Sequence, residues 1–289
     1  MNRETHAPKL ISQHQRVWRT FLRNRAAVIG LILTILVIFV SAAAPLIALQ
    51  DPLDQSARNR LKSPDETYLL GRDTFGRDVF ARVLYAGRVS LVVGVAAILL
   101  GGVIGTIMGL VAGYSGGKVE NAIMRFVDIL MAFPSLLLGL TVLAVLGPGL
   151  EKMILAIGIM FSPGFARVVH GSTLSVKAHE FVEAARCVGA HQTRILRLHI
   201  LPNVFGEIVV LGSLWTASAI RVEASLSFIG LGVAPPTPTW GNMIRDGTLH
   251  LTNAPWLSVF PGLAILITVL AFNLLGDGLR DVLDPRLQQ

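Results

Sequence analysis

The chain has 289 residues, of which 53% are hydrophobic and only 15% are charged. In soluble domains about a quarter of all residues are charged. The apolar residues of this chain also fall in long uncharged runs, so the composition excludes an ordinary soluble protein and indicates an integral membrane protein. The formal net charge of +7 fits basic residues at the ends of membrane spans and requires no nucleic-acid partner. The single cysteine, Cys187, can form no internal disulfide, and the sequence predicts no metal site.

The N-terminal segment, residues 1–25, is polar and basic, and Glu4 is its only acid. The positive-inside rule therefore predicts that it is cytoplasmic, and the part from Trp18 to Arg25 is a candidate for a short amphipathic helix on the membrane surface. Residues 26–49 carry no charge and are the first predicted span. Because this run has spanning length, it is not a cleavable signal.

Residues 50–88 are predicted to lie outside, in the periplasm or the extracellular space. The first part has no periodic pattern, whereas the second predicts an amphipathic helix that begins with Asp73 as N-cap and leads into the second span. Its expected features are an apolar stripe and one i,i+4 ion pair, formed by Phe75, Val79 and Val83 and by Asp78 with Arg82, respectively. A strap that shields the bundle is favoured over a helix that contacts substrate.

The second and third spans follow in the predicted core of the protein, residues 89–286. Residues 89–117 are uncharged, and the spacing of Gly101, Gly105 and Gly109 predicts close helix packing. The next helix is interrupted by Phe133 and Pro134 and continues to about Leu146, so we expect a kink at Pro134. Two interpretations of this kink stay open: it lines a transport pathway, or it is only a bend.

The remaining spans are predicted at residues 153–176, 208–229 and 254–276, with Trp256 as an interfacial anchor. Residues 287–289 form a cytoplasmic tail, so six spans place both termini inside. The fifth span carries Arg221 and Glu223, and charges within a span usually face the bundle interior or water. Two residues apart on a helix, they do not share a face. They are candidates for the outer half of a translocation pathway, and snorkelling to the interface is the alternative.

A polar, basic loop separates the fourth and fifth spans, at about residues 176–203. Helical spacing and two small alanines predict a short helix that Gly189 ends, because glycine readily adopts the left-handed conformation. A second short helix follows, which Pro202 is expected to prevent from continuing. The exposed alanines beside an acidic residue form a surface that another protein could approach closely, although a solvated loop that only obeys the positive-inside rule has the same charge.

This loop resembles the EAA loop of ABC importer membrane subunits, which docks on the ATPase subunit. The residues that match the motif are Glu183, Ala184, Ala185, Gly189, Leu201 and Pro202. His199 stands where the motif has Ile, and we expect it to pack beside the second short helix. We call residues 176–203 the EAA loop below.

Three other stretches resemble one branch of these importers, the dipeptide, oligopeptide and nickel permeases, and in particular their C-type dipeptide subunits. They are Leu70 to Asp78, in which Arg72 replaces the usual Thr, Asp128 to Pro134, and the run LSFIGLGVAPPTPTWG after the fifth span. The closing run FNLLGDGLRDVLDPR also matches the branch.

The resemblance implies an all-α membrane protein with six transmembrane helices in a type I ABC importer permease bundle, a cytoplasmic EAA coupling helix and an outer amphipathic helix. It implies a bacterial inner-membrane subunit that forms half of a translocation pathway for di- and oligopeptides. The implied partners are a second homologous permease, two ABC ATPase subunits, a periplasmic or lipid-anchored substrate-binding protein and membrane lipid.

No ATP site is expected in this chain. The run Gly116-Gly117-Lys118 is followed by Val119 and lacks the earlier glycine of a Walker A motif, so ATP and Mg are expected on the partner subunits. The sequence predicts no catalytic residue, because the scattered histidines form neither a metal-binding pattern nor a nucleophile–base arrangement within a span.

Alternatives remain at two levels. The same importer role could serve nickel chelates, opines, sugars or other small solutes. In a different class, the chain could be an ATP-independent channel or secondary transporter, but the sequence shows no internal repeat that would support this function.

Overall fold

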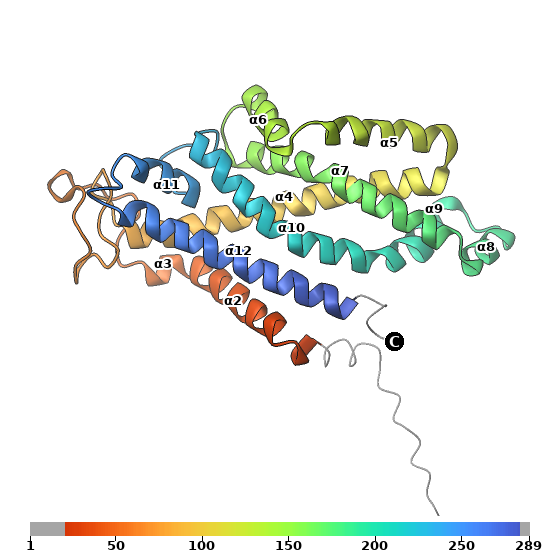
Figure 1. The fold of residues 1–289 in the computed structure, drawn as a ribbon, viewed down its shortest axis with the longest axis horizontal. Coiled ribbons are helices and arrows are strands. Elements are labelled where there is room, and N and C mark those ends of the chain that lie inside the picture. The colour runs from red at the N-terminus through yellow and green to blue at the C-terminus, as the bar shows by residue number, and fades with distance from the viewer. Residues whose placement is uncertain (1–20, 284–289) are drawn as a thin grey trace, which may run out of the picture.

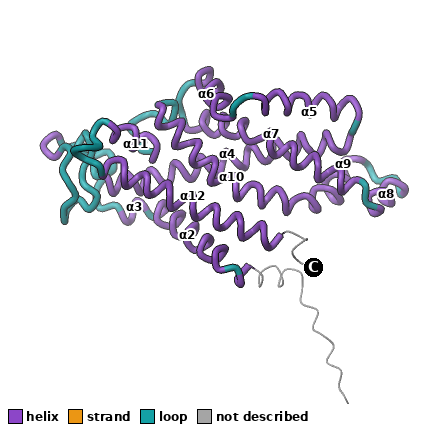
Figure 2. The backbone as a smooth tube through the Cα atoms, in the orientation of Figure 1, coloured by secondary structure: helices purple, strands orange, loops and turns teal. Residues whose placement is uncertain are grey.

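The computed structural model describes residues 21–283, without the side chain of Leu283. The predicted cytoplasmic tail, residues 287–289, most of the predicted N-terminal segment and the first three residues of the predicted surface helix lie outside this range. Within it the chain is helical, without strands (Figure 2). The longer helices are α2 (Arg25–Ala42), α4 (Val79–Ser115), α5 (Gly117–Ala132), α6 (Ser135–Leu146), α7 (Leu150–Lys177), α8 (Glu180–Cys187), α10 (Leu201–Ile229), α11 (Trp240–Thr248) and α12 (Trp256–Leu283). The short ones are α3 (Ala44–Ile47), a 3₁₀ turn (Ala57–Asn59), α9 (Gln192–Ile195) and a π-helical stretch (Leu196–Ile200).

The predicted all-α membrane architecture is confirmed. Five helical runs among the described residues are long and apolar enough to cross a membrane, and α5 with α6 makes a sixth if this bent pair is one span. The long helices lie side by side in one bundle (Figure 1). The EAA loop occupies one end, called the α8 end here. The opposite end, called the α11 end, carries α3, the long loop after it and α11.

The two ends of the described chain are neighbours. Asn24 Nδ2 donates a hydrogen bond to Asp281 Oδ2 at 2.9 Å, and Phe21 and Ala27 pack with Val282. Both ends lie nearer to the α8 end of the bundle than to the α11 end (Figure 1). This arrangement agrees with an even number of crossings.

The most extensive helix contact joins α4 and α7, and the predicted glycine spacing makes it possible. A Cβ atom on Gly105 would lie 2.3 Å from the carbonyl oxygen of Ser162, and one on Gly109 would lie 2.6 Å from that of Ala166. The two backbones therefore touch directly, as small residues in membrane helices allow. The interpretation of these glycines as packing residues is confirmed.

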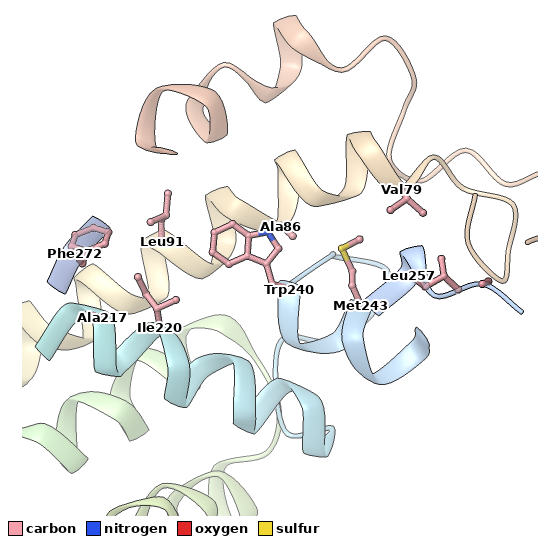
Figure 3. Packing of buried hydrophobic residues seen from close by; sticks show 10 residues of the cluster. Val79, Ala86, Leu91, Ala217, Ile220, Trp240, Met243, Leu257 and Phe272 are labelled. Atoms are coloured by element: carbon pink, nitrogen blue, oxygen red, sulfur yellow. The ribbon is translucent and has the colours of Figure 1, made fainter. Parts of the chain in front are cut away.

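Helix α11 lies between the fifth and sixth predicted spans, where the sequence predicted no helix. The Thr239 hydroxyl caps its N-terminus by accepting from the Asn242 N–H. The side-chain oxygen of Asn242 accepts in turn from the Thr239 N–H, which completes a capping box. Trp240 then packs between α4 and α10 beside Ala86, and its Nε1 donates to the carbonyl oxygen of Val83 at 3.0 Å (Figure 3). Helix α11 thus closes one end of the bundle with an apolar core.

The start of α4 differs from the prediction. Asp73 is not an N-cap: its carboxylate accepts from the backbone N–H groups of Phe75 and Arg77, which holds the chain in a turn. Such local side-chain bonds compete with helix formation. Asp78 is the cap instead, and α4 then runs without a break for 37 residues. The predicted outer amphipathic helix is therefore the beginning of the second spanning helix, and it does not include Phe75.

The expectation that Pro202 stops a helix was wrong. A continuous helical run leads from Gln192 to Ile229, and Pro202 lies in the first turn of α10. The preceding turn is π-helical, with the N–H of Leu201 bonded to the carbonyl of Leu196. Proline has no N–H to donate, and the N-terminal turn of a helix tolerates this loss.

Phe133 and Pro134 cause more than the predicted kink. Both residues have extended ψ angles, 138° and 124°, and the axes of α5 and α6 meet at 94°. The residue before a proline avoids helical angles, which explains why α5 ends there.

Candidate coupling site in the EAA loop

Helix α8 attaches to the bundle through one face. Val182 is fully buried and Ala185 is nearly so. Both belong to an apolar cluster with Tyr114 from the last turn of α4 and with three residues of the helical run that follows α8: Ile195, Ile200 and Val204. Glu183 and Ala184 point away from this contact and are exposed. The predicted coupling residues of α8 are therefore divided: Ala185 holds the helix in place, whereas Glu183 and Ala184 are accessible.

Gly189 ends α8 as predicted. Its φ of +79° lies in the left-handed region. Its N–H donates to the Arg186 carbonyl at 2.9 Å, and the N–H of Ala190 donates to that of Ala185 at 3.0 Å. This bonding pattern is a Schellman motif, which satisfies the last carbonyls of a helix. The sharp reversal brings the chain back under α8 within a few residues.

A hollow of about 640 Å³ lies between α8 and the returning chain. Its lining residues are Phe181, Ala184, Ala185, Val188, Gly189, Ala190, His191, Arg194 and His199. The rings of His199 and Phe181 are 6.5 Å apart at their centroids. The histidine that replaces the usual Ile thus lines this hollow, from the π-helical stretch. Leu201 is half-buried and Pro202 exposed just beyond it.

Two cations tie the EAA loop to the last turn of α4. The guanidinium of Arg186 lies 5.2 Å from the centroid of the Tyr114 ring. Lys177 Nζ lies 5.5 Å from the same centroid and donates to the Tyr114 carbonyl at 2.6 Å. A cation at a helix C-terminus also interacts favourably with the helix dipole. Sequence reasoning missed Tyr114 and Lys177, and an aromatic ring at the inner end of the second span was the available signal.

Further polar contacts join α5 and α10 to α7 in the same half of the bundle. His170 Nε2 lies 2.7 Å from Glu120 Oε1, and Arg167 pairs with Asp128. Ser172 bonds to Glu207 of α10. The two ion pairs hold the polar face of α5 against α7, and the Ser172 bond joins α7 to α10.

The three predicted pathway residues have different surroundings. Arg221 is exposed, and its guanidinium donates to Ser218 Oγ at 2.9 Å. Glu223 is fully buried, and its Oε1 accepts from Ser227 Oγ at 2.7 Å. Pro134 is exposed at the break between α5 and α6. Arg221 and Glu223 occupy different faces of α10, as predicted.

Buried charges organise the α11 end. Asp73 Oδ2 lies 2.7 Å from Arg77 Nε and 3.3 Å from Arg82 Nε, and all three side chains are nearly buried. The expected ion pair of Asp78 with Arg82 does not form, because Arg82 turns to Asp73 and to the carbonyl of Pro52. Burial raises the pKa of Asp78, and the hydrogen bond that its carboxylate accepts from the Ala81 N–H partly offsets this rise. This network fixes the long loop onto the start of α4.

Two family models match the chain. The model of the binding-protein-dependent transport system inner membrane component matches residues 103–289, which is more than half of the chain. The model of the N-terminal TM domain of oligopeptide transport permease C matches residues 12–64.

Curated relatives match over nearly the whole length. The chain is 43% identical over 272 residues to the glutathione transport system permease protein GsiD of Pectobacterium atrosepticum, covering 94% of this chain and 90% of that protein. It is 39% identical over 278 residues to the dipeptide transport system permease protein DppC of Alkalihalophilus pseudofirmus, covering 96% and 91%. These relatives are permease subunits of transport systems.

A solved structure shares the fold. The inward-facing MetNI methionine ABC transporter contains a chain that superposes with a TM-score of 0.57 at 20% identity, covering 70% of this chain and 96% of that one. The resemblance inferred from the EAA loop agrees with all of these matches. The chain belongs to the family of binding-protein-dependent transport system inner membrane components, as a non-catalytic permease subunit with the type I ABC importer fold in the dipeptide and oligopeptide branch.

Proposed function

We propose that this subunit forms half of the pathway through which an ATP-driven importer carries small peptides, and that α8 transmits the movement of an ATPase partner to the bundle. The relatives with glutathione and dipeptide transport in their names support a peptide cargo, since glutathione is itself a small peptide. A second homologous permease, two ATPase subunits that bind ATP and Mg, and a substrate-binding protein complete the proposed assembly.

The observation that carries the coupling role is the division of α8 into an anchored and an accessible face. Ala185 is packed into the bundle, while Glu183 and Ala184 stay exposed on the opposite side. A force applied to the exposed face reaches α4 through Arg186 and Tyr114, and it reaches α10 through the helical run that begins at Gln192. Because α8 is closely packed against the bundle, a displacement of α8 also displaces the helices that it contacts, as a mechanical coupler requires.

In this assembly the α8 end faces the cytoplasm, and both termini lie on that side. The basic N-terminal segment supports this orientation through the positive-inside rule. Reporter fusions to each terminus and to the loop after α3 test it: activity of a cytoplasmic reporter at the loop would overturn it.

For the pathway, the exposed position of Arg221 favours contact with charged or zwitterionic cargo. Glu223, enclosed between its neighbours, is better suited to holding α10 in place. Pro134 lies at an uncovered bend, where a change of angle between α5 and α6 would alter the width of a pathway.

The coupling role is tested with Glu183→Ala in the complete transporter, with Glu180→Ala as matched control. Both glutamates are exposed and lie in the first turn of α8. We expect Glu183→Ala to reduce uptake roughly tenfold or more, as the loss of a hydrogen bond to a charged group would, while ATPase subunits still hydrolyse ATP and the permease still inserts. Full uptake by the Glu183 variant, or equal losses in both variants, would refute the assignment.

The cargo is tested by uptake in a strain that lacks the permease, complemented with this chain and its partner genes. The panel contains glutathione, dipeptides, longer peptides, nickel chelates and opines. Preferential uptake of peptides supports the proposal, and uptake of only chelates or opines would replace the cargo while leaving the coupling role intact. Uptake without any ATPase subunit would instead indicate a channel or secondary transporter.

A further inference from the structure

A groove of about 480 Å³ runs between α2 and α4 on the surface of the bundle. Its lining is apolar apart from one hydroxyl and one cation, and consists of Ile38, Ser41, Ala42, Arg88, Leu91, Val92, Val95, Ala96 and Leu99. The two helices separate here by enough to admit a chain of carbon atoms. The groove ends at Arg88 on the side of the α11 end, because Arg88 precedes every other lining residue of α4.

Arg88 has no acidic partner among the described residues. Its side chain is exposed, and its one described contact is with Tyr85, whose ring centroid lies 5.7 Å from the guanidinium carbon. The planar guanidinium therefore presents free N–H donors at the mouth of the groove. Such a fork matches the oxygens of a phosphate group.

The depth of Arg88 in the membrane follows from its neighbours. It is the last charge before the uncharged run of residues 89–117, so it marks the edge of the hydrocarbon layer. Tyr85 lies one turn earlier and is partly exposed. Tyr and Trp concentrate at the level of lipid headgroups. The guanidinium is thus placed where a lipid phosphate would lie.

We propose that this groove is a binding site for an anionic glycerophospholipid, with one acyl chain along Leu91, Val95 and Leu99 and the phosphate on Arg88. The guanidinium offers a bidentate partner for a phosphate at headgroup level, and the apolar lining suits an acyl chain. An apolar helix of a second permease would fill the groove less well, because it would leave the donors of Arg88 without acceptors.

A second groove in the same structure provides a comparison. It lies between α4 and α10, has a volume of about 520 Å³ and shares Val95 and Leu99 with the first, but no charged residue lines it. Acyl chains of any lipid can occupy it without regard to the headgroup. Selectivity for an anionic headgroup is therefore expected to depend on Arg88 alone.

The experiment measures lipid binding to the complete transporter by native mass spectrometry, with phosphatidylglycerol and phosphatidylcholine of identical acyl chains. The variants are Arg88→Gln, Arg88→Lys and Ala42→Phe, and the control is Arg60→Gln, an exposed arginine in the loop after α3. Arg88→Gln should weaken phosphatidylglycerol binding about fivefold, the effect of one headgroup contact near the surface. It should weaken phosphatidylcholine binding less, because the choline cation offsets the charge of the phosphate that contacts Arg88.

The other variants separate the two parts of the site. Arg88→Lys should retain most of the preference for phosphatidylglycerol, and Ala42→Phe should weaken both lipids, because it fills the groove. Arg60→Gln should change neither.

Three results would overturn the proposal. The first is equal binding of the two lipids by the unmodified transporter, and the second is unchanged phosphatidylglycerol binding by Arg88→Gln. The third is efficient crosslinking of a cysteine placed at the exposed Val92 to the second permease, which would show that a protein covers the groove.

Discussion

The guanidinium of Arg186 lies 5.2 Å from the centre of the Tyr114 ring, and this contact links the EAA loop to the end of the longest helix. Lys177 approaches the same ring at 5.5 Å. One aromatic side chain therefore interacts with two cations, one from the C-terminus of α7 and one from α8. Lys177 also holds the Tyr114 carbonyl, whereas the described contact of Arg186 is with the ring, so the Tyr114 side chain adds to the apolar packing that holds α8.

Replacing Tyr114 with Leu should loosen α8, whereas Tyr114→Phe should not. Each cation–π contact contributes about 0.5–1 kcal/mol at a partly exposed site, and leucine offers neither. Hydrogen–deuterium exchange of residues 180–190 in the assembled transporter measures the effect, which we expect as faster exchange in the Leu variant together with a lower ratio of uptake to ATP hydrolysis. Similar exchange in both variants would mean that the ring acts only through its apolar area.

Gly189→Ala should destabilise the end of α8 by about 1–2 kcal/mol, because alanine is strained in the left-handed conformation. The φ of Gly189 is +79°, and an added Cβ would meet no atom within 4 Å. The cost is therefore conformational and not steric. Exchange at the amide of Ala190, which bonds across the reversal, is the measurement.

Gly206→Ala is the matched control for this change. An added Cβ at Gly206 also meets nothing within 4 Å, but this residue lies inside α10. Alanine there should be neutral or stabilising, because it favours helix. A loss of protection equal to that of Gly189→Ala would contradict the conformational explanation.

Gly105→Ala should force α4 and α7 apart, while Gly102→Ala should be tolerated. The new Cβ at position 105 would lie 2.3 Å from the Ser162 carbonyl oxygen, whereas at position 102 its nearest neighbour is a ring atom of Phe165 at 3.5 Å. Overpacking against backbone typically costs about 1–3 kcal/mol. The apparent melting temperature of the purified transporter should fall only in the Gly105 variant, and a fall in both would weaken the assignment of this close contact.

Asp73→Asn should lower the melting temperature strongly, because it removes the carboxylate that pairs with the buried Arg77 and Arg82. Breaking a buried ion pair from one side typically costs about 3–5 kcal/mol. Asn keeps an oxygen that can accept the backbone N–H bonds of Phe75 and Arg77, so the variant isolates the charge.

The control is Asp65→Asn, which removes the partner of Lys62 at 2.7 Å from an exposed ion pair. Solvent screens this pair, so no measurable change in melting temperature is expected. Comparable effects of the two substitutions would contradict the view that the buried network holds the loop after α3.

Arg221→Ala and Glu223→Ala should affect different properties. Among the described residues the guanidinium of the exposed Arg221 bonds to Ser218 alone, so its loss should leave the melting temperature unchanged and reduce uptake. Loss of Glu223 leaves the buried Ser227 hydroxyl unsatisfied, which costs about 1–3 kcal/mol. Uptake and melting temperature measured on the same preparations separate the two roles, and a normal melting temperature for Glu223→Ala would return that residue to the list of pathway candidates.

Much of the architecture could be predicted from the sequence, because local patterns carry it. The uncharged runs correspond to the spanning helices, the glycine spacing on α4 corresponds to the contact with α7, and Gly189 ends α8. Hydropathy, side-chain size and backbone preference act on neighbouring residues, so each of these features can be read from a short window of the chain.

Other features required the tertiary structure. Asp73 could have been a cap or a turn residue, and contacts with Arg77 and Arg82 decide between them. Helix α11 depends on a core formed by α4, α10 and α12, which lie far apart in the sequence. Pro202 continues a helix because a π-helical turn precedes it.

The α8 surface shows both contributions. The sequence by itself determined the motif that ends in Gly189 and the presence of Glu183 beside small residues. Only the tertiary structure decided that Ala185 faces the bundle, that Glu183 faces outward and that Tyr114 lies beneath Arg186. The physical reason is that a residue's position along a helix sets its angle around the axis, whereas the neighbour that covers that angle comes from a distant part of the chain.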